Sequence, residues 1–331
     1  MSRFKYFTKP IIFFSAASAI LFTLLFLSKN HFSSHLDRSD DSAVETFDFH
    51  DTEDEQKWFS NDIVSTNPIP NIVHFIWLNN PDLNFITYLS IRATLISLQP
   101  DQIVLHYTSL NKENQWFAKV SKHLTLVQHD LNKEYPVQVE QKWKMSHISD
   151  LLRLDILYNE GGIYLDTDVI PLRDFDRLLH LDKDLILGNE GGDRHGLCNA
   201  VIIARQGSSF IERWRQSYES FSRSEWNYHS VILPKELSVS FPDEVCNLSP
   251  AAFFWPTWTK NHIKYMHDVI KGDEVGNFKR TLNANRGAMY PQQLAYHGWT
   301  QVASGYLKNL DPAIIKSRDT RFNIMARRFL E

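Results

Sequence analysis

The chain after Pro70 alternates continuous apolar runs with segments of helical spacing, and this alternation limits the folds that it can adopt. The runs "NIVHFIWL", "DQIVLHYT" and "LTLVQHD" are typical of buried parallel strands. The segments "YLSIRATLISL" and "SHISDLLRLDILYNEGG" have helical spacing, and the second is expected to begin near Ser146 and to end at Gly161-Gly162. The strand "IYLD" follows directly. This order predicts an α/β fold with a mostly parallel sheet and helices on both faces.

Two carboxylates follow the last of these strands, in "GGIYLDTDVIPL". Open α/β sheets bind ligands at the carboxyl ends of their strands, which is where Asp166 and Asp168 fall. Side chains two residues apart in an extended segment point the same way, so both can converge on one cation. Hard oxygen ligands favour Mg²⁺ or Mn²⁺. The alternative is a turn in which an aspartate caps backbone amides.

The N-terminus has a different character. Residues 10–28, "PIIFFSAASAILFTLLFLS", carry no charge, and as a helix they would span about 28 Å, close to the thickness of a bilayer. Arg3, Lys5 and Lys9 precede the run, so residues 1–9 are expected in the cytosol and the rest across the membrane. A cleaved signal peptide is the alternative, but the apolar run is longer than its usual core. A single transmembrane signal anchor is therefore favoured.

An acidic segment comes next. Residues 37–57 hold nine carboxylates against two basic residues and contain no Gly or Pro, so residues 29–69 are predicted to be a flexible stem. Residues 70–331 would then form one folded domain. The formal net charge of −4 provides no basic footprint for nucleic acid. Cys198 and Cys246 either form a disulfide or remain thiols, and Asn247 begins a glycosylation sequon.

The stretch "SDLLRLDILYNEGGIYLDTDVIPL" resembles the sugar-binding region of the DXD-containing glycosyltransferase family 32. That family includes Golgi mannosyltransferases and α1,4-galactosyl- and N-acetylglucosaminyltransferases, and weaker resemblance extends from Ile69 to Leu307. The resemblance implies a Rossmann-like GT-A fold, a nucleotide-sugar donor, Mn²⁺ (or Mg²⁺), and an α-linked product on a glycan or glycolipid acceptor. Together with the anchor it implies a type II Golgi membrane glycoprotein with a lumenal catalytic domain.

The resemblance also implies roles for individual residues. It places Asp166 and Asp168 on the metal that bridges the donor diphosphate, with Asp168 the more direct ligand. Asp150 and Arg153 match an Asp and an Arg that contact the donor sugar in large glucosylating bacterial toxins with related catalytic domains. An accepting carboxylate and a forked guanidinium suit sugar and phosphate oxygens. The alternative for this pair is an ion pair on the surface of a helix.

Four more residues come from the same resemblance. Trp77 ends the first strand, where the toxins carry a Trp that stacks on uracil; its alternative is the core. His297 and Trp299 in "YHGWTQ" match a His-x-Trp of the family, which implies that His297 contacts metal or diphosphate and Trp299 the donor. Asn199 in "GLCNAVIIA" resembles an Asn near the sugar. The aromatic run of residues 253–258, "FFWPTW", either packs in the core, which is favoured, or presents rings to an acceptor.

The donor and the class of protein have alternatives. Mannosyltransferase members commonly read "IHQTWK" where this chain reads "VHFIWLN", which favours a UDP-sugar over GDP-mannose without excluding the latter. A phosphatase of the haloacid-dehalogenase type also uses Asp-x-Asp after a strand, but normally has Thr or Val two residues after the second Asp, where this chain has Ile170. A non-catalytic, membrane-anchored sugar-binding protein is the remaining alternative.

Overall fold

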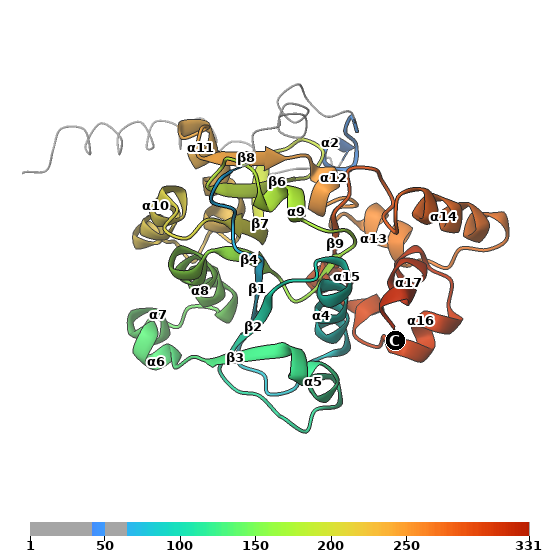
Figure 1. Ribbon diagram of the computed structural model, residues 1–331, viewed down its shortest axis with the longest axis horizontal. Helices are drawn as coiled ribbons and strands as arrows, with labels where there is room; N and C mark the ends of the chain where they lie inside the picture. Colours follow the sequence, from blue (N-terminus) through green and yellow to red (C-terminus); the bar gives the residue numbers. More distant parts are fainter. Residues whose placement is uncertain (1–41, 50–64, 331) are drawn as a thin grey trace, which may run out of the picture. The chain divides into compact units, whose positions relative to one another are not determined.

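Seven strands form the central sheet of the computed structural model, which describes residues 42–49 and 65–330 (Figure 1). Across the sheet the strands follow the order β3-β2-β1-β4-β7-β6-β8, and β5 and β9 form a separate pair. The strands are β1 (Ile72–Trp77), β2 (Gln102–Tyr107), β3 (Leu124–Gln128), β4 (Gly162–Leu165), β5 (Val169–Pro171), β6 (Leu185–Glu190), β7 (Gly196–Ala204), β8 (Val245–Leu248) and β9 (Ala295–His297). Strand β7 runs antiparallel to β4 and β6, whereas the other neighbours in this sheet pair in parallel. The mostly parallel sheet is confirmed.

Helices connect the strands and continue to the C-terminus (Figure 1). They are α2 (Ser42–Glu45), α4 (Phe85–Ser97), α5 (Gln115–Val120), α6 (Leu131–Glu134), α7 (Pro136–Glu140), α8 (Met145–Glu160), α9 (Asp176–Leu179), α10 (Ser209–Ser217), α11 (Leu233–Ser240), α12 (Pro250–Phe253), α13 (Lys260–His267), α14 (Asp273–Ala284), α15 (Thr300–Leu307), α16 (Pro312–Ser317) and α17 (Arg321–Ala326). Shorter 3₁₀ turns cover Ser121–His123, Tyr218–Ser220 and Arg327–Phe329, and a π-helical turn covers Tyr228–Ile232.

An apolar layer covers each face of the sheet, because successive side chains of a strand point to opposite sides. In β4, Ile163 and Leu165 belong to the layer that contains α4, whereas Tyr164 belongs to the layer that contains α8 and α10. The expectation of helices on both faces is therefore confirmed.

The junction between α8 and β4 delivers the Asp-x-Asp segment to the end of the sheet. Helix α8 ends at Glu160 as expected, and Gly161 and Gly162 have φ angles of +68° and +102°. A Cβ at Gly162 would lie 2.6 Å from the carbonyl oxygen of Ile72 in the neighbouring strand. Only glycine therefore allows α8 to turn at once into β4, which places Asp166 directly after the strand.

Residues 42–49 differ from the flexible stem predicted for residues 29–69. Val44 is 1% exposed, and the rings of Phe47 and Phe49 pack on Trp255 with centroid distances of 4.5 and 5.9 Å. The three apolar side chains of this short stretch are sufficient to dock it, although acidic residues surround them in the sequence. The predicted anchor at residues 10–28 lies outside the described residues. In the part of the chain that is described, we find no helix with the length and apolar character to cross a membrane.

The two cysteines are separate buried thiols, Cys198 on β7 and Cys246 on β8, with β6 between these strands. The disulfide alternative is therefore not realised in the structure. Asn247, the residue of the sequon, lies within β8, and its side-chain amide donates a hydrogen bond to Ser238.

A row of imidazoles at one edge of the sheet joins β1 and β2 and continues to His129, just after β3. His74 on β1 lies 3.1 Å from both the Gly161 carbonyl and His106 on β2, and His106 lies 2.9 Å from His129. His74 and His106 are both satisfied as neutral rings if each donates from Nε2 and accepts at Nδ1, and His129 then donates to His106 from Nε2 and to the Glu134 carboxylate from Nδ1. Burial lowers the pKa of His74 from its ordinary value of 6.5 to about 4 and that of His106 to about 3.

This pair makes the free energy of unfolding depend on pH. In the unfolded chain both rings bind protons below about pH 6.5, whereas the folded rings stay neutral until about pH 4. Their contribution is thus complete above pH 6.5 and is lost as the pH falls toward 4. We expect chemical unfolding to show a loss on the order of 2 kcal/mol per ring between pH 7.5 and 5.0.

Two single variants separate this pair from other titrating groups. His74→Gln, whose amide can still donate to Gly161, should reduce the difference in unfolding free energy between pH 7.5 and 5.0 by the amount expected for one ring. Replacement of the exposed His123 by Gln should leave this difference unchanged. An unfolding free energy that is equal at pH 7.5 and 5.0 in the wild type would contradict the assignment.

Candidate active site

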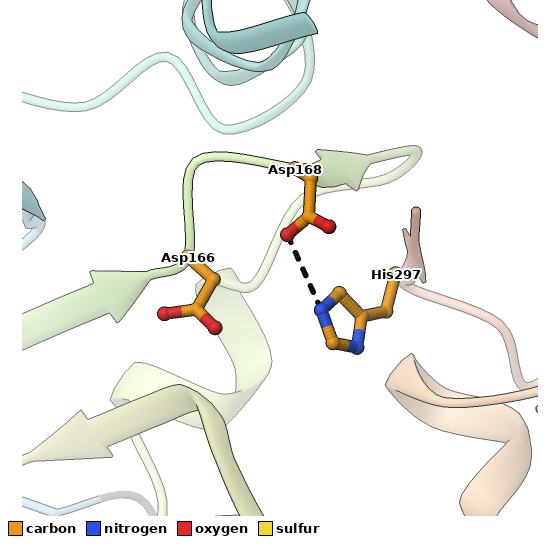
Figure 2. Close-up of side chains that lie close together, drawn as sticks. All are labelled: Asp166, Asp168 and His297. Atoms are coloured by element: carbon orange, nitrogen blue, oxygen red, sulfur yellow. Dashed lines mark ion pairs between the residues drawn. The ribbon is translucent and has the colours of Figure 1, made fainter. Parts of the chain in front are cut away.

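A short antiparallel pairing brings together residues that are far apart in the sequence. Strand β5 pairs with β9, and Val169 lies opposite His297, so the imidazole is held beside Asp168 (Figure 2). The His297 Nε2 atom is 3.2 Å from Asp168 Oδ1, and the Thr300 backbone amide donates to Asp168 Oδ2 at 2.8 Å. Both oxygens of Asp168 are thus fixed in orientation.

Asp166 completes a group of possible metal ligands. Asp166, Asp168 and His297 each offer one ligand atom, and these atoms lie within 4.8 Å of one another (Figure 2). Two carboxylates and one imidazole form a donor set suited to a divalent cation. The structure therefore favours the cation site over a turn in which the aspartates cap only backbone amides.

The environment shifts the pKa values of the two aspartates in opposite directions. Burial raises the pKa of Asp166, and the neighbouring charge of Asp168 adds to this effect, while Arg153 opposes it. For Asp168, burial alone would raise the pKa, but the His297 charge and the hydrogen bonds from His297 and Thr300 outweigh it and lower the pKa. Burial would lower the pKa of His297, yet Asp168 holds it above its ordinary value. The three side chains therefore form one electrostatically coupled cluster at the end of β4.

Asp150 and Arg153 do not form the surface ion pair that was the alternative for them. Both lie on α8 and are buried, 7% and 5% exposed. The Arg153 guanidinium is 3.2 Å from Asp150 Oδ1 and 3.0 Å from Asp166 Oδ1, and it also donates to the Asn199 carbonyl at 2.8 Å. It thus bridges helix α8, strand β7 and the first aspartate of the motif.

Asn199 and Tyr164 complete this buried network. The Asn199 amide donates to Asp150 Oδ1 at 2.8 Å, and the Tyr164 hydroxyl donates to Asp166 Oδ1 at 2.6 Å. The Arg153 guanidinium carbon lies 4.4 Å from the centre of the Tyr164 ring. Each carboxylate therefore keeps one oxygen engaged by protein donors, which fixes its orientation before any ligand binds.

These groups line a cavity of about 540 Å³. Of the residues proposed from the sequence, its wall includes Asp150, Arg153, Asp166, Asp168, Asn199, His297 and Trp299. Trp299 packs on His297 with a centroid distance of 4.0 Å, and its indole nitrogen donates to the Pro256 carbonyl. A cavity of this size, with converging polar groups and aromatic walls, suits a small-molecule ligand.

Trp77 has a different position. The lining of the cavity includes its neighbour Ile76, whereas Trp77 packs against the apolar layer on the other face. Its buried indole nitrogen has no hydrogen-bond partner among the described residues. The structure therefore leaves the base-stacking role of Trp77 as a prediction.

Several lining residues were not identified from the sequence. They include Tyr164, Glu190, Trp226 and Thr300. Tyr164 could have been found, because the alternation of β4 puts it on the same side of the strand as Asp166, two residues on. Glu190 ends β6 and Trp226 lies in a distant loop, and no local pattern marks either residue. Most of the aromatic run of residues 253–258 is buried in the core, which is the alternative that the sequence favoured. Its last ring, Trp258, lies in the cavity wall.

The arrangement predicts that Arg153 is needed for stability as well as for the site. Arg153→Met removes the cation that compensates Asp150 and Asp166, and leaving buried carboxylates unpaired should cost about 3 kcal/mol in chemical unfolding. Replacement of the exposed Arg280 by Met is the matched control and should cost less than about 1 kcal/mol. Equal stability of Arg153→Met and the wild type would contradict this role.

Comparison with known proteins gives the family of this chain. Residues 79–184 match the family model described as the glycosyltransferase sugar-binding region containing the DXD motif. Glucan organizing enzyme 1 of Cryptococcus neoformans is 35% identical over 278 residues, which cover 79% of this chain and 71% of that protein. Inositol phosphoceramide mannosyltransferase 3 of Schizosaccharomyces pombe is 29% identical over 194 residues, covering 58% of this chain and 46% of that protein.

Similarity to solved structures is lower. The match to the PaToxG glycosyltransferase covers 79% of this chain and 87% of that chain, with 16% sequence identity. Its TM-score is 0.43, and we draw no inference from it. The sequence relatives carry the assignment, and they exclude the haloacid-dehalogenase alternative. The chain belongs to the family of glycosyltransferases that contain the DXD sugar-binding region.

Proposed function

We propose that this glycosyltransferase has the GT-A fold and transfers a sugar from a nucleotide-sugar donor to a hydroxyl of a glycan or glycolipid, with retention of the α configuration. The observation that carries the proposal is the grouping of Asp166, Asp168 and His297 at the wall of the cavity. The mostly parallel sheet and the family assignment support it. The family assignment favours an enzyme over a sugar-binding protein without activity.

The residues present fit a divalent cation, and we propose Mn²⁺ or Mg²⁺. The oxygen-rich donor set suits either ion. The His297 Nε2 atom faces Asp168 at 3.2 Å, so this nitrogen and the carboxylates of Asp166 and Asp168 would hold the ion together (Figure 2). When bound, such an ion offsets the negative charge that develops on a departing nucleotide diphosphate.

The side chains around this site would hold the donor sugar. Asp150 is fixed by Asn199 and Arg153 at Oδ1, and its Oδ2, which lies 3.6 Å from His147 Nδ1, would accept a hydrogen bond from a sugar hydroxyl. Arg153 supplies a positive charge that contacts both Asp150 and Asp166 and compensates them. Trp299 forms an aromatic wall beside His297 and would contact the donor.

The relatives bear on the donor and the acceptor. One is named for glucan and another as an inositol phosphoceramide mannosyltransferase, which supports a polysaccharide or glycolipid acceptor. We favour a UDP-sugar as the donor because of the segment around Trp77. GDP-mannose is the second candidate, favoured by the mannosyltransferase relative.

The location of the protein is part of the proposal. The uncharged run of residues 10–28 after Arg3, Lys5 and Lys9 supports a single-pass type II anchor, with residues 70–331 on the lumenal side of the Golgi membrane.

The cation site gives the most direct test of activity. Asp168→Asn removes a ligand charge, so we expect release of nucleotide from the donor to fall at least about 100-fold, with Asp166→Asn nearly as severe. Excess EDTA should abolish turnover, and added Mn²⁺ should restore it. The exposed Asp176 provides the matched control, and Asp176→Asn should keep full turnover. Wild-type turnover by Asp168→Asn, or full activity in EDTA, would refute the proposed metal role.

The base of the donor has a separate test at Trp77. If the indole stacks on uracil, Trp77→Ala should weaken UDP binding about 5- to 150-fold, whereas Trp77→Phe should keep much of the affinity. Calorimetric titration of UDP and GDP with Mn²⁺ into the wild type and both variants measures this. If Trp77 is a core residue only, both variants lose stability and bind UDP as the wild type does. Tighter binding of GDP than of UDP by the wild type would defeat the donor assignment.

A further inference from the structure

Residues 42–49, in the segment that the sequence predicts to be a stem, make specific contacts with the folded domain. The Val44 carbonyl accepts a hydrogen bond from the Gly192 amide at 2.9 Å, and the Phe49 carbonyl accepts one from the Gln292 side chain at 3.0 Å. Asn261 donates to Glu45 at 3.0 Å. With the buried Val44 and the two phenylalanines on Trp255, these contacts make a continuous docked segment.

The docked segment contacts two loops that form part of the cavity wall. One runs from Glu190, the last residue of β6, to Gly192, and Glu190 lines the cavity. The other runs from Trp255 to Trp258, and Trp258 lines the cavity. Val44 and Trp258 both lie beside Gly191, because a Cβ on Gly191 would be 3.4 Å from Val44 and 3.6 Å from Trp258. The docked segment therefore contacts the first loop where that loop meets the second.

The second loop leads to the cation site. Trp258 packs on Trp299 with a centroid distance of 5.5 Å, and Trp299 also donates to the Pro256 carbonyl at 2.9 Å. Trp299 in turn packs on His297, which contacts Asp168. Side chains in contact therefore connect residues 42–49 to the proposed metal ligands.

Gly192 shows how closely the segment fits. A Cβ on this residue would lie 2.1 Å from the Thr46 carbonyl oxygen and 3.0 Å from the Ala43 carbonyl oxygen. Gly192 is not among the residues with positive φ, so its backbone conformation accepts alanine. An alanine there would thus clash with the docked segment rather than strain its own loop.

We propose that residues 42–49 are a positioning element of the catalytic unit, which holds the loops 190–192 and 255–258 against the site. The proposal rests on the proposed function for its effect on turnover, but not for its effect on the loops. Release of the segment would leave Glu190, Trp258 and Trp299 less confined, and small displacements of positioned groups lower the rate of a catalysed step.

The test uses the full chain with Gly192→Ala and, as an independent variant, Val44→Asp, which places a charge at the buried contact. Hydrogen–deuterium exchange measures protection of residues 42–49, 190–192 and 255–258. Release of UDP from a mixture of UDP-glucose, UDP-galactose and UDP-N-acetylglucosamine with Mn²⁺ measures turnover. The control is Gly305→Ala, because a Cβ there meets nothing within 4 Å.

We expect both variants to exchange at least about tenfold faster in all three segments and to lose about 10- to 100-fold in turnover, with unchanged far-ultraviolet circular dichroism. The double variant should be no worse than the more severe single one, because both changes release the same segment. Gly305→Ala should match the wild type in exchange and turnover.

Two results would overturn the proposal. One is wild-type protection of residues 42–49 in both variants, which would mean that the segment is not docked as described. The other is a variant in which residues 42–49 exchange faster but the two loops do not, or in which residues 42–49 exchange faster and turnover is unchanged. If the wild type releases no UDP from the mixture, the proposed donor fails, and the exchange of the two loops alone decides the positioning role.

Discussion

The confinement of negative charge at the end of β4 is the constraint on which the rest of the site depends. Asp150, Asp166 and Asp168 lie close together and are largely withdrawn from solvent, and carboxylates in such a place are costly unless cations compensate them. Arg153 compensates the first two and His297 the third. Asp166 and Asp168 together bring two carboxylates to one imidazole, so the group remains suited to a divalent ion.

The backbone around this cluster is arranged to hold it. Gly161 and Gly162 let α8 pass directly into β4, so Asp150, Arg153 and Asp166 come together from one continuous stretch. The pairing of β5 with β9 then adds His297 from the far end of the domain. Hydrogen bonds within the protein orient each carboxylate, so a ligand would meet side chains already in place.

Much of this could be predicted from the sequence, where local patterns decide the structure. The apolar runs and the Gly-Gly stop gave the strands, helix α8 and the position of Asp166 and Asp168. The register between Val169 and His297 could not be read from local pattern, because it joins segments more than a hundred residues apart; only the family resemblance indicated His297. Trp77 ends β1, as the sequence indicated. Because side chains alternate between the faces of the sheet, its neighbour Ile76 lines the cavity, and the base-stacking role of Trp77 stays a prediction. The docking of residues 42–49 was missed because the acidic composition of the segment hid three apolar side chains that pack only on distant loops.

The most direct measurement of the central claim is anomalous diffraction from crystals of the protein grown with Mn²⁺ and UDP. The account predicts one strong manganese peak between Asp166, Asp168 and His297, with the diphosphate oxygens completing its coordination. A peak elsewhere in the cavity, or bound UDP with no manganese at these three side chains, would contradict it.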